Sequence, residues 1–263
     1  MCVVAHSSPC LGPNHRDTKK KRILDLWPAA KRAIVFVMTL SNFIYATIAA
    51  VIAYYIIKRT LAKAERQRQI PNLLFADVAS LFTNAEIKPG ESLGSHVLSG
   101  LYDNQNFELK TITDTLNTRK LPSLWLMITL KSPLPIKHTL DMMLRPAGPS
   151  TFSNFDFLPV ILPTPSGFPD LAVLRSDGDT SPFDLNLLRP TLTYFKNPRA
   201  KEFLATPNGL RFVTQLGEAE RARYLVAREA RFEGQAIDAV ETKMALELLL
   251  ALKNNLQQHY GHV

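Results

Sequence analysis

The motif GESLG, residues 90–94, is the segment whose residue types and spacing come nearest to a catalytic signature. A G-x-S-x-G motif presents a nucleophilic serine on a strained turn between a strand and a helix. The residues before this motif, NAEIKP, contain no apolar strand, and the chain has no HGGG-like oxyanion segment. A triad built on Ser92 would also need an acid and one of His138, His259 or His262. We therefore expect residues 84–95 to form a surface loop, and a serine hydrolase that uses Ser92 is the alternative function.

Two other segments contain metal-binding residue types without a metal-binding pattern. The segment RSDGDTSPFD brings together Asp177, Asp179 and Asp184, but its glycine and proline stand at the wrong positions for an EF-hand loop. His259 and His262 lie three positions apart in a polar tail, with no cysteine or acidic partner nearby. The sequence also has no C-x-x-C pair, no HExxH motif and no phosphate-binding glycine loop. We therefore predict no cofactor and no metal site.

The first structural element is an apolar run of 25 residues, 33–57, without a charged side chain. A helix of this length, rising about 1.5 Å per residue, can cross a hydrocarbon core of roughly 30 Å. Basic pairs bound the run at both ends, which is rare for a buried helix of a soluble protein. The run is also too long for the apolar part of a cleaved signal peptide. We predict a retained, single-pass transmembrane helix over 33–57.

Positive charge belongs to this predicted anchor and its flanks. Residues 1–70 contain 12 basic and 3 acidic side chains, whereas residues 71–263 contain 19 and 20. A nearly neutral domain gives no basis for nucleic acid binding, although the whole chain carries a net charge of +8. The basic flanks are either topology signals or contacts for anionic lipid headgroups; the residues predicted to contact lipid are Lys19, Lys20, Lys21, Arg22, Lys58 and Arg59.

The orientation of the span follows from its flanks. Seven basic residues precede the apolar run and five follow it, which favours a cytoplasmic N-terminus with the large domain on the opposite side. Cys2 and Cys10 both lie in the N-terminal tail, so cysteine usage fits either compartment. The chain thus divides into a basic tail (1–32), a transmembrane helix (33–57), a basic juxtamembrane helix (58–70) and one extramembrane domain (71–263).

The domain mixes helix and strand patterns, which predicts the α+β class. Residues 73–82 have apolar side chains at helical spacing, and 107–111 alternate apolar and charged side chains as in a half-buried strand. The apolar run 124–131 predicts a central strand, and HTLDMMLRP (138–146) predicts the next one. The Pro-, Ser- and Gly-rich stretch 146–190 predicts loops with one or two short strands in FLPVIL and LAVLR.

Cap and turn residues organise the following part of the domain. LTYF (192–195) predicts a strand, and residues 224–227 predict another. Asn197, followed by a proline, resembles an N-cap with proline at the first helical position, and predicts a short helix. Thr206 with the next proline repeats the pattern and predicts a second short helix.

Residues 237–256 have the clearest helical pattern of the domain. They predict a long C-terminal helix packed on a sheet through an apolar stripe made of Ile237, Val240, Met244, Leu248 and Ala251. The predicted architecture is therefore a single N-terminal transmembrane helix followed by one mixed α+β domain.

The order of elements over residues 121–256 resembles a loose group of bacterial membrane-anchored proteins of unknown function. The resemblance rests on apolar strands, a Pro-rich stretch with FPDLAVLRSDGD, the segment LTYFKNPRAKEFLATPNGLRFVTQL and a Leu-rich C-terminal helix. It implies a bacterial protein with one or two N-terminal spans before a small α+β domain, and no site residue. We expect a membrane-tethered structural or protein-interaction domain that binds another membrane or membrane-associated protein.

Overall fold

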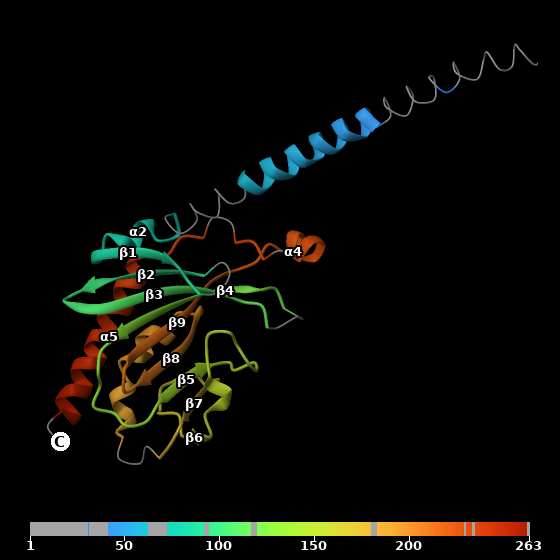
Figure 1. Ribbon diagram of the computed structural model, residues 1–263. Coiled ribbons are helices and arrows are strands. Elements are labelled where there is room, and N and C mark those ends of the chain that lie inside the picture. Colours follow the sequence, from blue (N-terminus) through green and yellow to red (C-terminus); the bar gives the residue numbers. More distant parts are fainter. Residues whose placement is uncertain are drawn as a thin grey trace, which may run out of the picture. The chain divides into compact units, whose positions relative to one another are not determined.

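The computed structural model describes residues 31, 42–62, 73–91, 95–116, 120–179, 183–228, 230–232 and 235–261 (Figure 1). The chain forms two compact units, Met1–Arg66 and Gln67–Val263. In the first unit, Asn42–Ala62 is a 21-residue helix whose most apolar stretch of 18 residues has a mean hydropathy of 1.3, and none of that stretch is buried. By length and composition this helix can cross a membrane. It overlaps the predicted span from residue 42 onward, and residues 33–41 lie outside the described part.

The second unit is α+β, with one large antiparallel sheet, as predicted. The nine strands follow the order β1-β2-β3-β4-β9-β8-β5-β7-β6. Their bounds are β1 (Thr83–Pro89), β2 (His96–Tyr102), β3 (Gln105–Asp114), β4 (Ser123–Lys131), β5 (Leu140–Leu144), β6 (Val160–Leu162), β7 (Ala172–Ser176), β8 (Ala200–Thr206) and β9 (Gly209–Glu218). The helices are α2 (Ala76–Ala79), η1 (Phe155–Phe157), η2 (Leu185–Leu188), α3 (Thr191–Phe195), α4 (Arg221–Ala227) and α5 (Ala239–Tyr260).

The long C-terminal helix α5 packs on the sheet against β4 and β9, which confirms its prediction. Asp238 caps it, because its Oδ1 accepts a hydrogen bond from the Glu241 amide at 2.8 Å. Of the predicted apolar stripe, Ile237 is buried in the main core as expected, but the helical part is wrong by about one position: Val240 is 79% exposed and Leu248 is only partly buried. The buried stripe is made of Thr242, Ala245, Leu246, Leu249, Leu252 and Leu256.

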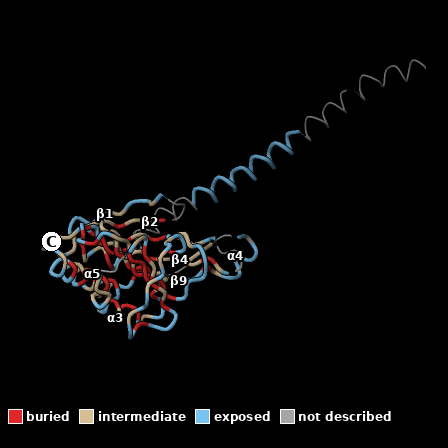
Figure 2. Tube along the Cα trace, turned by 90° about the horizontal axis from the view of Figure 1, so that it is seen from below, coloured by how far each residue is buried: buried red, intermediate tan, exposed pale blue. Residues whose placement is uncertain are grey.

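Side chains are buried on both faces of the sheet, and most buried residues lie near its middle (Figure 2). All five residues of strand β5 are buried. Because successive side chains of a strand point to opposite faces, both faces of the sheet are covered at β5. Its alternate residues Leu140, Met142 and Leu144 join the main core, which includes α5. Met143 joins a smaller cluster on the second face. There the connection between β5 and β6, residues 145–159, contributes Phe152, whose ring centroid lies 4.8 Å from that of Trp125. We call residues 145–159 the covering segment.

Three predictions for residues 192–218 are wrong about the type of element: one expected strand is a helix, and two expected helices are strands. Residues 192–195 were expected to form a strand but belong to helix α3. The helix expected after Asn197 is strand β8, because the Asn197 side chain accepts from the Arg199 amide at 2.9 Å and makes a local turn. The helix expected after Thr206 is strand β9, which follows a tight hairpin. A Cβ at Gly209 would lie 2.1 Å from the Leu130 carbonyl oxygen, so this close approach requires glycine.

Two more expectations need correction. Residues 224–227, expected as a strand, belong to helix α4. Residues 84–89, expected as a loop, belong to the exposed edge strand β1. The other strands predicted from apolar patterns are present as β3, β4, β5, β6 and β7.

Candidate functional site

The GESLG motif lies in the connection between β1 and β2, and Ser92 lies outside the described residues. On its two sides, the Gly90 amide donates to the Ser95 carbonyl at 2.8 Å, and β2 begins at the next residue, His96. The motif therefore joins a strand to a strand. A nucleophile elbow instead joins a strand to a helix, and the helix N-terminus supports the reacting serine.

His138 and Asp177, considered above for different sites, form one pair. His138 Nδ1 lies 3.2 Å from Asp177 Oδ1, and the Thr139 amide donates to the same oxygen at 3.0 Å. Partial burial works against ionisation, but the hydrogen bonds from Thr139 and His138 keep the pKa of Asp177 below its usual value. Both side chains of the pair are partly exposed at the surface.

The sheet separates this pair from the GESLG motif. His138 precedes β5, which is five strand positions from β2, or about 24 Å at roughly 4.8 Å per strand. Ser95, the first described residue after the motif, immediately precedes β2. The strand order therefore places His138 and Ser95 at different parts of the sheet.

Asp177 and Asp184 both accept hydrogen bonds from backbone amides. Asp184 Oδ1 accepts from the Asn186 amide at 2.9 Å and caps η2. Among the residues that the structure describes, no group of three or more His, Cys, Asp or Glu side chains could hold a metal ion. His259 lies in the last turn of α5, with its ring centroid 4.6 Å from that of Tyr260. His262 lies outside the described residues.

A buried polar cluster on the second face of the sheet was not predicted. It consists of Asp141 on β5, Glu202 on β8, Arg211 on β9 and Ser153 of the covering segment. Asp141 is 2% exposed and Glu202 is 0% exposed. Arg211 Nη2 donates to Glu202 Oε2 at 3.0 Å. Ser153 Oγ donates to Glu202 Oε1 and lies 3.4 Å from Asp141 Oδ2, so the cluster joins three strands to the covering segment.

Burial and, next, the neighbouring Glu202 together raise the pKa of Asp141 to about 9, and Arg211 and Ser153 oppose this with smaller effects. Asp141 is therefore protonated at neutral pH, and Glu202 pairs with the Arg211 guanidinium. Because both carboxyl groups are inaccessible, they cannot meet a substrate. The arrangement fixes the covering segment on the sheet.

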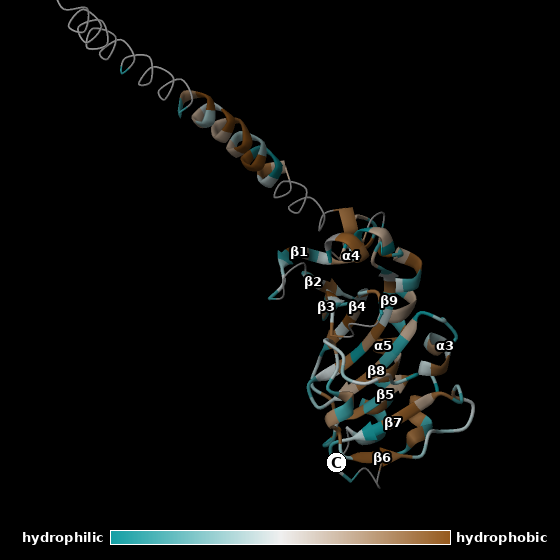
Figure 3. Cartoon of the chain, turned by 90° about the vertical axis from the view of Figure 1, so that its right-hand side faces the viewer, coloured by the Kyte–Doolittle hydropathy of each residue, from teal (hydrophilic) through white to brown (hydrophobic). Residues whose placement is uncertain are grey.

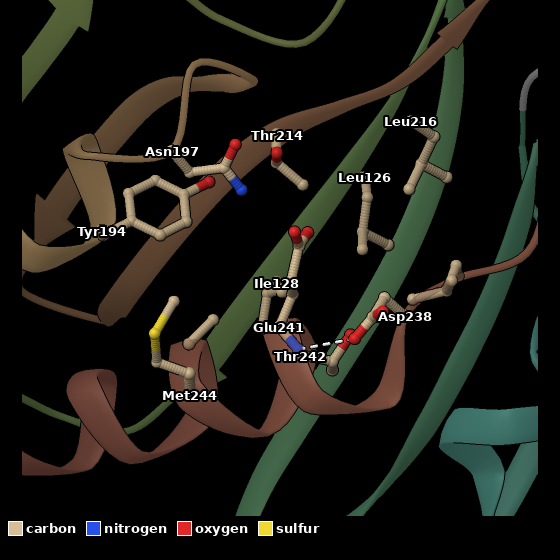
Figure 4. Close-up of a pocket in the computed structure, with 12 residues that line it drawn as sticks. Leu126, Ile128, Tyr194, Asn197, Thr214, Leu216, Asp238, Glu241, Thr242 and Met244 are labelled. Carbon is tan, nitrogen blue, oxygen red and sulfur yellow. Dashed lines mark hydrogen bonds between the residues drawn. The ribbon is translucent and has the colours of Figure 1, made fainter.

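A small polar cavity lies between α5 and the sheet (Figure 4). Tyr194 from α3, Thr214 from β9, Asn197 and Glu241 direct polar groups toward the same space. The Tyr194 and Thr214 hydroxyls are buried and interact with each other, but among the described residues neither makes a hydrogen bond of normal geometry. Burial raises the pKa of Tyr194 above its usual value, so its hydroxyl stays protonated.

The size of the cavity limits what it can hold. Its volume is about 20 Å³, and a single water needs roughly 10–15 Å³. One water could accept from one hydroxyl and donate to the other, which would satisfy two groups whose unpaired burial costs about 1–3 kcal/mol each. The cavity is therefore suited to hydration and is too small for an organic substrate.

The basic residues predicted to contact lipid fall into two groups. Lys58 and Arg59 lie on helix Asn42–Ala62, and Lys58 Nζ is 6.0 Å from the centroid of the Tyr54 ring. The other four residues, Lys19, Lys20, Lys21 and Arg22, lie outside the described residues.

Comparison with known proteins gave one similar structure. No protein-family model matches the chain, and no curated protein matches it. The crystal structure of the mycobacterial trehalose monomycolate transport factor A, TtfA, is similar at 12% sequence identity and a TM-score of 0.37. The match covers 70% of this chain and 96% of that chain. A TM-score below 0.5 does not establish a shared fold.

Proposed function

We propose that this protein is a membrane-tethered structural or protein-interaction domain, anchored through the helix that contains Asn42–Ala62. The proposal depends on this 21-residue apolar helix, whose most apolar stretch is not buried. The rest of the chain from Gln67 onward forms a separate compact unit. An apolar helix without a protein cover exposes a large hydrophobic surface to water. A bilayer removes that surface from water, and Lys58 and Arg59 then meet the headgroup layer.

The polar groups of the domain support interaction rather than catalysis. The Asp141–Glu202 pair is inaccessible and fixes the covering segment. The cavity beside Tyr194 has room for one or two waters. The GESLG motif joins two strands, without the strand-to-helix turn that activates a serine.

The edge strand β6 supports a protein partner. Three apolar side chains around β6 are exposed: Phe157 by 78%, Ile161 by 65% and Leu171 by 63%. Strand β6 pairs with β7 on one side and is the last strand of the sheet on the other. An exposed strand edge with apolar side chains suits an extended, apolar segment of a partner, which adds a strand to the sheet.

Anchoring is tested by fractionation of cells that make the full chain. The protein should sediment with membranes and stay there in alkaline carbonate and in high salt, because an apolar span is not held by charge. Release into the supernatant by salt alone would contradict the anchor.

Partner binding is tested by a photo-crosslinking amino acid placed at Ile161 in the full chain. The matched control carries the same group at Glu86, an exposed residue of the opposite edge strand β1. We expect a membrane protein adduct of defined mass from position 161 and none from position 86. Equal adduct patterns at the two positions, or no adduct at either, would contradict a partner at the β6 edge.

A further inference from the structure

Helix α4 is the most exposed apolar element of the domain. None of its side chains from Arg221 to Val226 is buried, and its residues Leu225 and Val226 are 62% and 90% exposed (Figure 2). A helix of seven residues is marginal in water without a packed face. Its sequence, RARYLVA, has two arginines and no acidic residue, and one of them, Arg223, pairs with the N-cap residue Glu220 at 2.9 Å.

The helical positions sort these residues into an amphipathic pattern. At about 100° per residue, Ala222, Leu225 and Val226 fall within one sector of roughly 100°, and Arg221 and Arg223 flank that sector on either side. Tyr224 lies on the opposite side and is partly buried. A narrow apolar sector between arginines is the pattern of helices that lie in a membrane interface.

Basic groups continue beyond the helix itself. Arg228, the C-cap residue, is exposed and lies 5.5 Å from the centroid of the Tyr224 ring. The connection between β3 and β4 is joined to this region, because the Ala219 amide donates to the Pro122 carbonyl at 2.8 Å. That connection exposes Leu116 by 57%, and it also exposes Lys120.

This surface lies at the end of the domain where the chain enters it. Figures 1 and 3 show α4 and β1 at one end of the domain and β6 at the other. The segment that follows α4 leads to Ile237, whose amide donates to the Leu74 carbonyl at 3.2 Å. Leu74 belongs to the first described residues of the domain, and its neighbour Leu73 is 71% exposed.

The length of the tether brings this end within reach of the bilayer. Ten residues separate Ala62, the last residue of the apolar helix, from Leu73. Even fully extended, that connection spans no more than about 40 Å. If the apolar helix is anchored, Leu73 therefore lies no more than about 40 Å from the end of that helix.

We propose that α4 is a second, interfacial membrane contact of this protein, which binds a bilayer surface rich in anionic lipid. Leu225 and Val226 enter the boundary between headgroups and acyl chains, and Arg221 and Arg228 bind lipid phosphates. The inference rests on the proposed anchor and deepens it, because it assigns the lipid surface a specific site on the folded domain.

The test uses the full chain with Cys2→Ser and Cys10→Ser, reconstituted into vesicles of phosphatidylcholine and phosphatidylglycerol in equal amounts. An environment-sensitive fluorophore is attached after Val226→Cys, or in the control after Phe157→Cys at the opposite end of the domain. Vesicles are first floated on a density gradient, and quenching by a lipid-borne spin label is then measured in the floated fraction.

We expect a blue-shifted, quenched fluorophore at position 226 and a water-exposed, unquenched one at position 157. In the chain labelled at position 226, Arg221→Gln together with Arg228→Gln should lower the ratio of docked to undocked α4 by up to about 30-fold. This estimate assumes that each arginine contributes roughly 1 kcal/mol near an anionic surface. Vesicles of phosphatidylcholine alone should give the same loss.

Each contrary result has a distinct meaning. A chain that floats while both fluorophores remain equally exposed to water contradicts the α4 contact and leaves the anchor intact. If quenching at position 226 stays the same after the arginine substitutions and in vesicles of phosphatidylcholine alone, that result contradicts the role of anionic headgroups. A chain that does not float contradicts the anchor, and the α4 inference fails with it.

Discussion

Arg211 Nη2 lies 3.0 Å from Oε2 of Glu202, a carboxylate whose side chain has no exposed surface. The arginine itself keeps 17% of its side chain exposed, so a partly solvated cation pairs with a fully buried carboxylate. Removing one partner from such a pair leaves an uncompensated buried charge, which costs about 3–5 kcal/mol. Burial, and after it the neighbouring Glu202, keep Asp141 protonated, because they raise its pKa more than Arg211 lowers it.

The first prediction concerns the pH dependence of stability. The folded protein holds a proton on Asp141 up to about pH 9, whereas the unfolded chain releases it near pH 4. The folded state therefore binds the extra proton between these values, and this contribution to stability is complete below about pH 4 and is lost as the pH rises toward 9. One such proton gives a slope of at most about 1.4 kcal/mol per pH unit.

Asp141→Asn should remove this slope, because an amide resembles the protonated carboxyl and does not titrate. We would measure the free energy of unfolding of the detergent-solubilised full chain between pH 5 and 8. The variant should become more stable relative to the natural chain as the pH rises. Asp156→Asn, which changes an exposed carboxyl of the covering segment, is the control. If the difference between Asp141→Asn and the natural chain does not change with pH, the assignment of a protonated Asp141 is wrong.

The second prediction concerns the packed face of α5. Leu249 is 0% exposed within the main core, whereas Val240 on the same helix is 79% exposed. Leu249→Ala should therefore cost about 2–5 kcal/mol of stability. Val240→Ala should change stability by less than about 0.5 kcal/mol.

Thermal or urea unfolding of the two variants side by side measures this difference. Leu248→Ala, at a partly buried position, should fall between them. A larger loss from Val240→Ala than from Leu249→Ala would mean that α5 packs through the stripe expected from the sequence and that its register on the sheet is wrong.

The sequence identified α5 but placed its buried face about one position away, for a physical reason. The segment ALELLLALKNNL contains two neighbouring apolar rows, one through Leu248 and one through Leu249, and both have helical spacing. Periodicity alone cannot choose between adjacent rows, because the choice depends on how the helix crosses β4 and β9. Val240 lies on the row that faces solvent.

The half-buried strands β3 and β4 were predicted from their apolar patterns, whereas the exposed edge strand β1 was missed. β3 and β4 alternate buried and partly exposed residues, which is the pattern that a half-buried strand requires. β1 is almost wholly exposed, so TNAEIKP carries no apolar alternation to detect. Asn197 and Thr206 precede prolines as helix caps do, but the same residues make turns, and only long-range pairing with β4 and β5 decides between these outcomes.

The buried cluster had no recognisable sequence signal. Asp141, Ser153, Glu202 and Arg211 are spread over seventy positions and share no motif. Asp141 lies inside the apolar run LDMML, where a single charged residue was the one available hint. Its partners follow from the strand order, which local patterns do not specify.

The third prediction concerns orientation, which rests on the basic flanks of the span. With the N-terminus in the cytoplasm, Cys2 and Cys10 should be protected from a membrane-impermeant maleimide in intact cells. After Cys2→Ser, Cys10→Ser and Phe157→Cys, the thiol at the exposed position 157 should react without lysis. Labelling of the native thiols in intact cells, with position 157 protected, would place the domain in the cytoplasm.

The last prediction is that Ser92→Ala leaves fold, membrane retention and any ester hydrolysis unchanged. The reason is geometric, because β2 begins at His96 and leaves no room for the helix that a nucleophile elbow requires after Ser92. Hydrolysis of short-chain nitrophenyl esters by purified full chain, together with labelling by a fluorophosphonate probe, measures this directly. Ser80→Ala, which changes an exposed serine outside the motif, is the matched control. A fluorophosphonate adduct that maps to Ser92 and disappears in Ser92→Ala but persists in Ser80→Ala would establish the hydrolase and overturn the interaction-domain proposal.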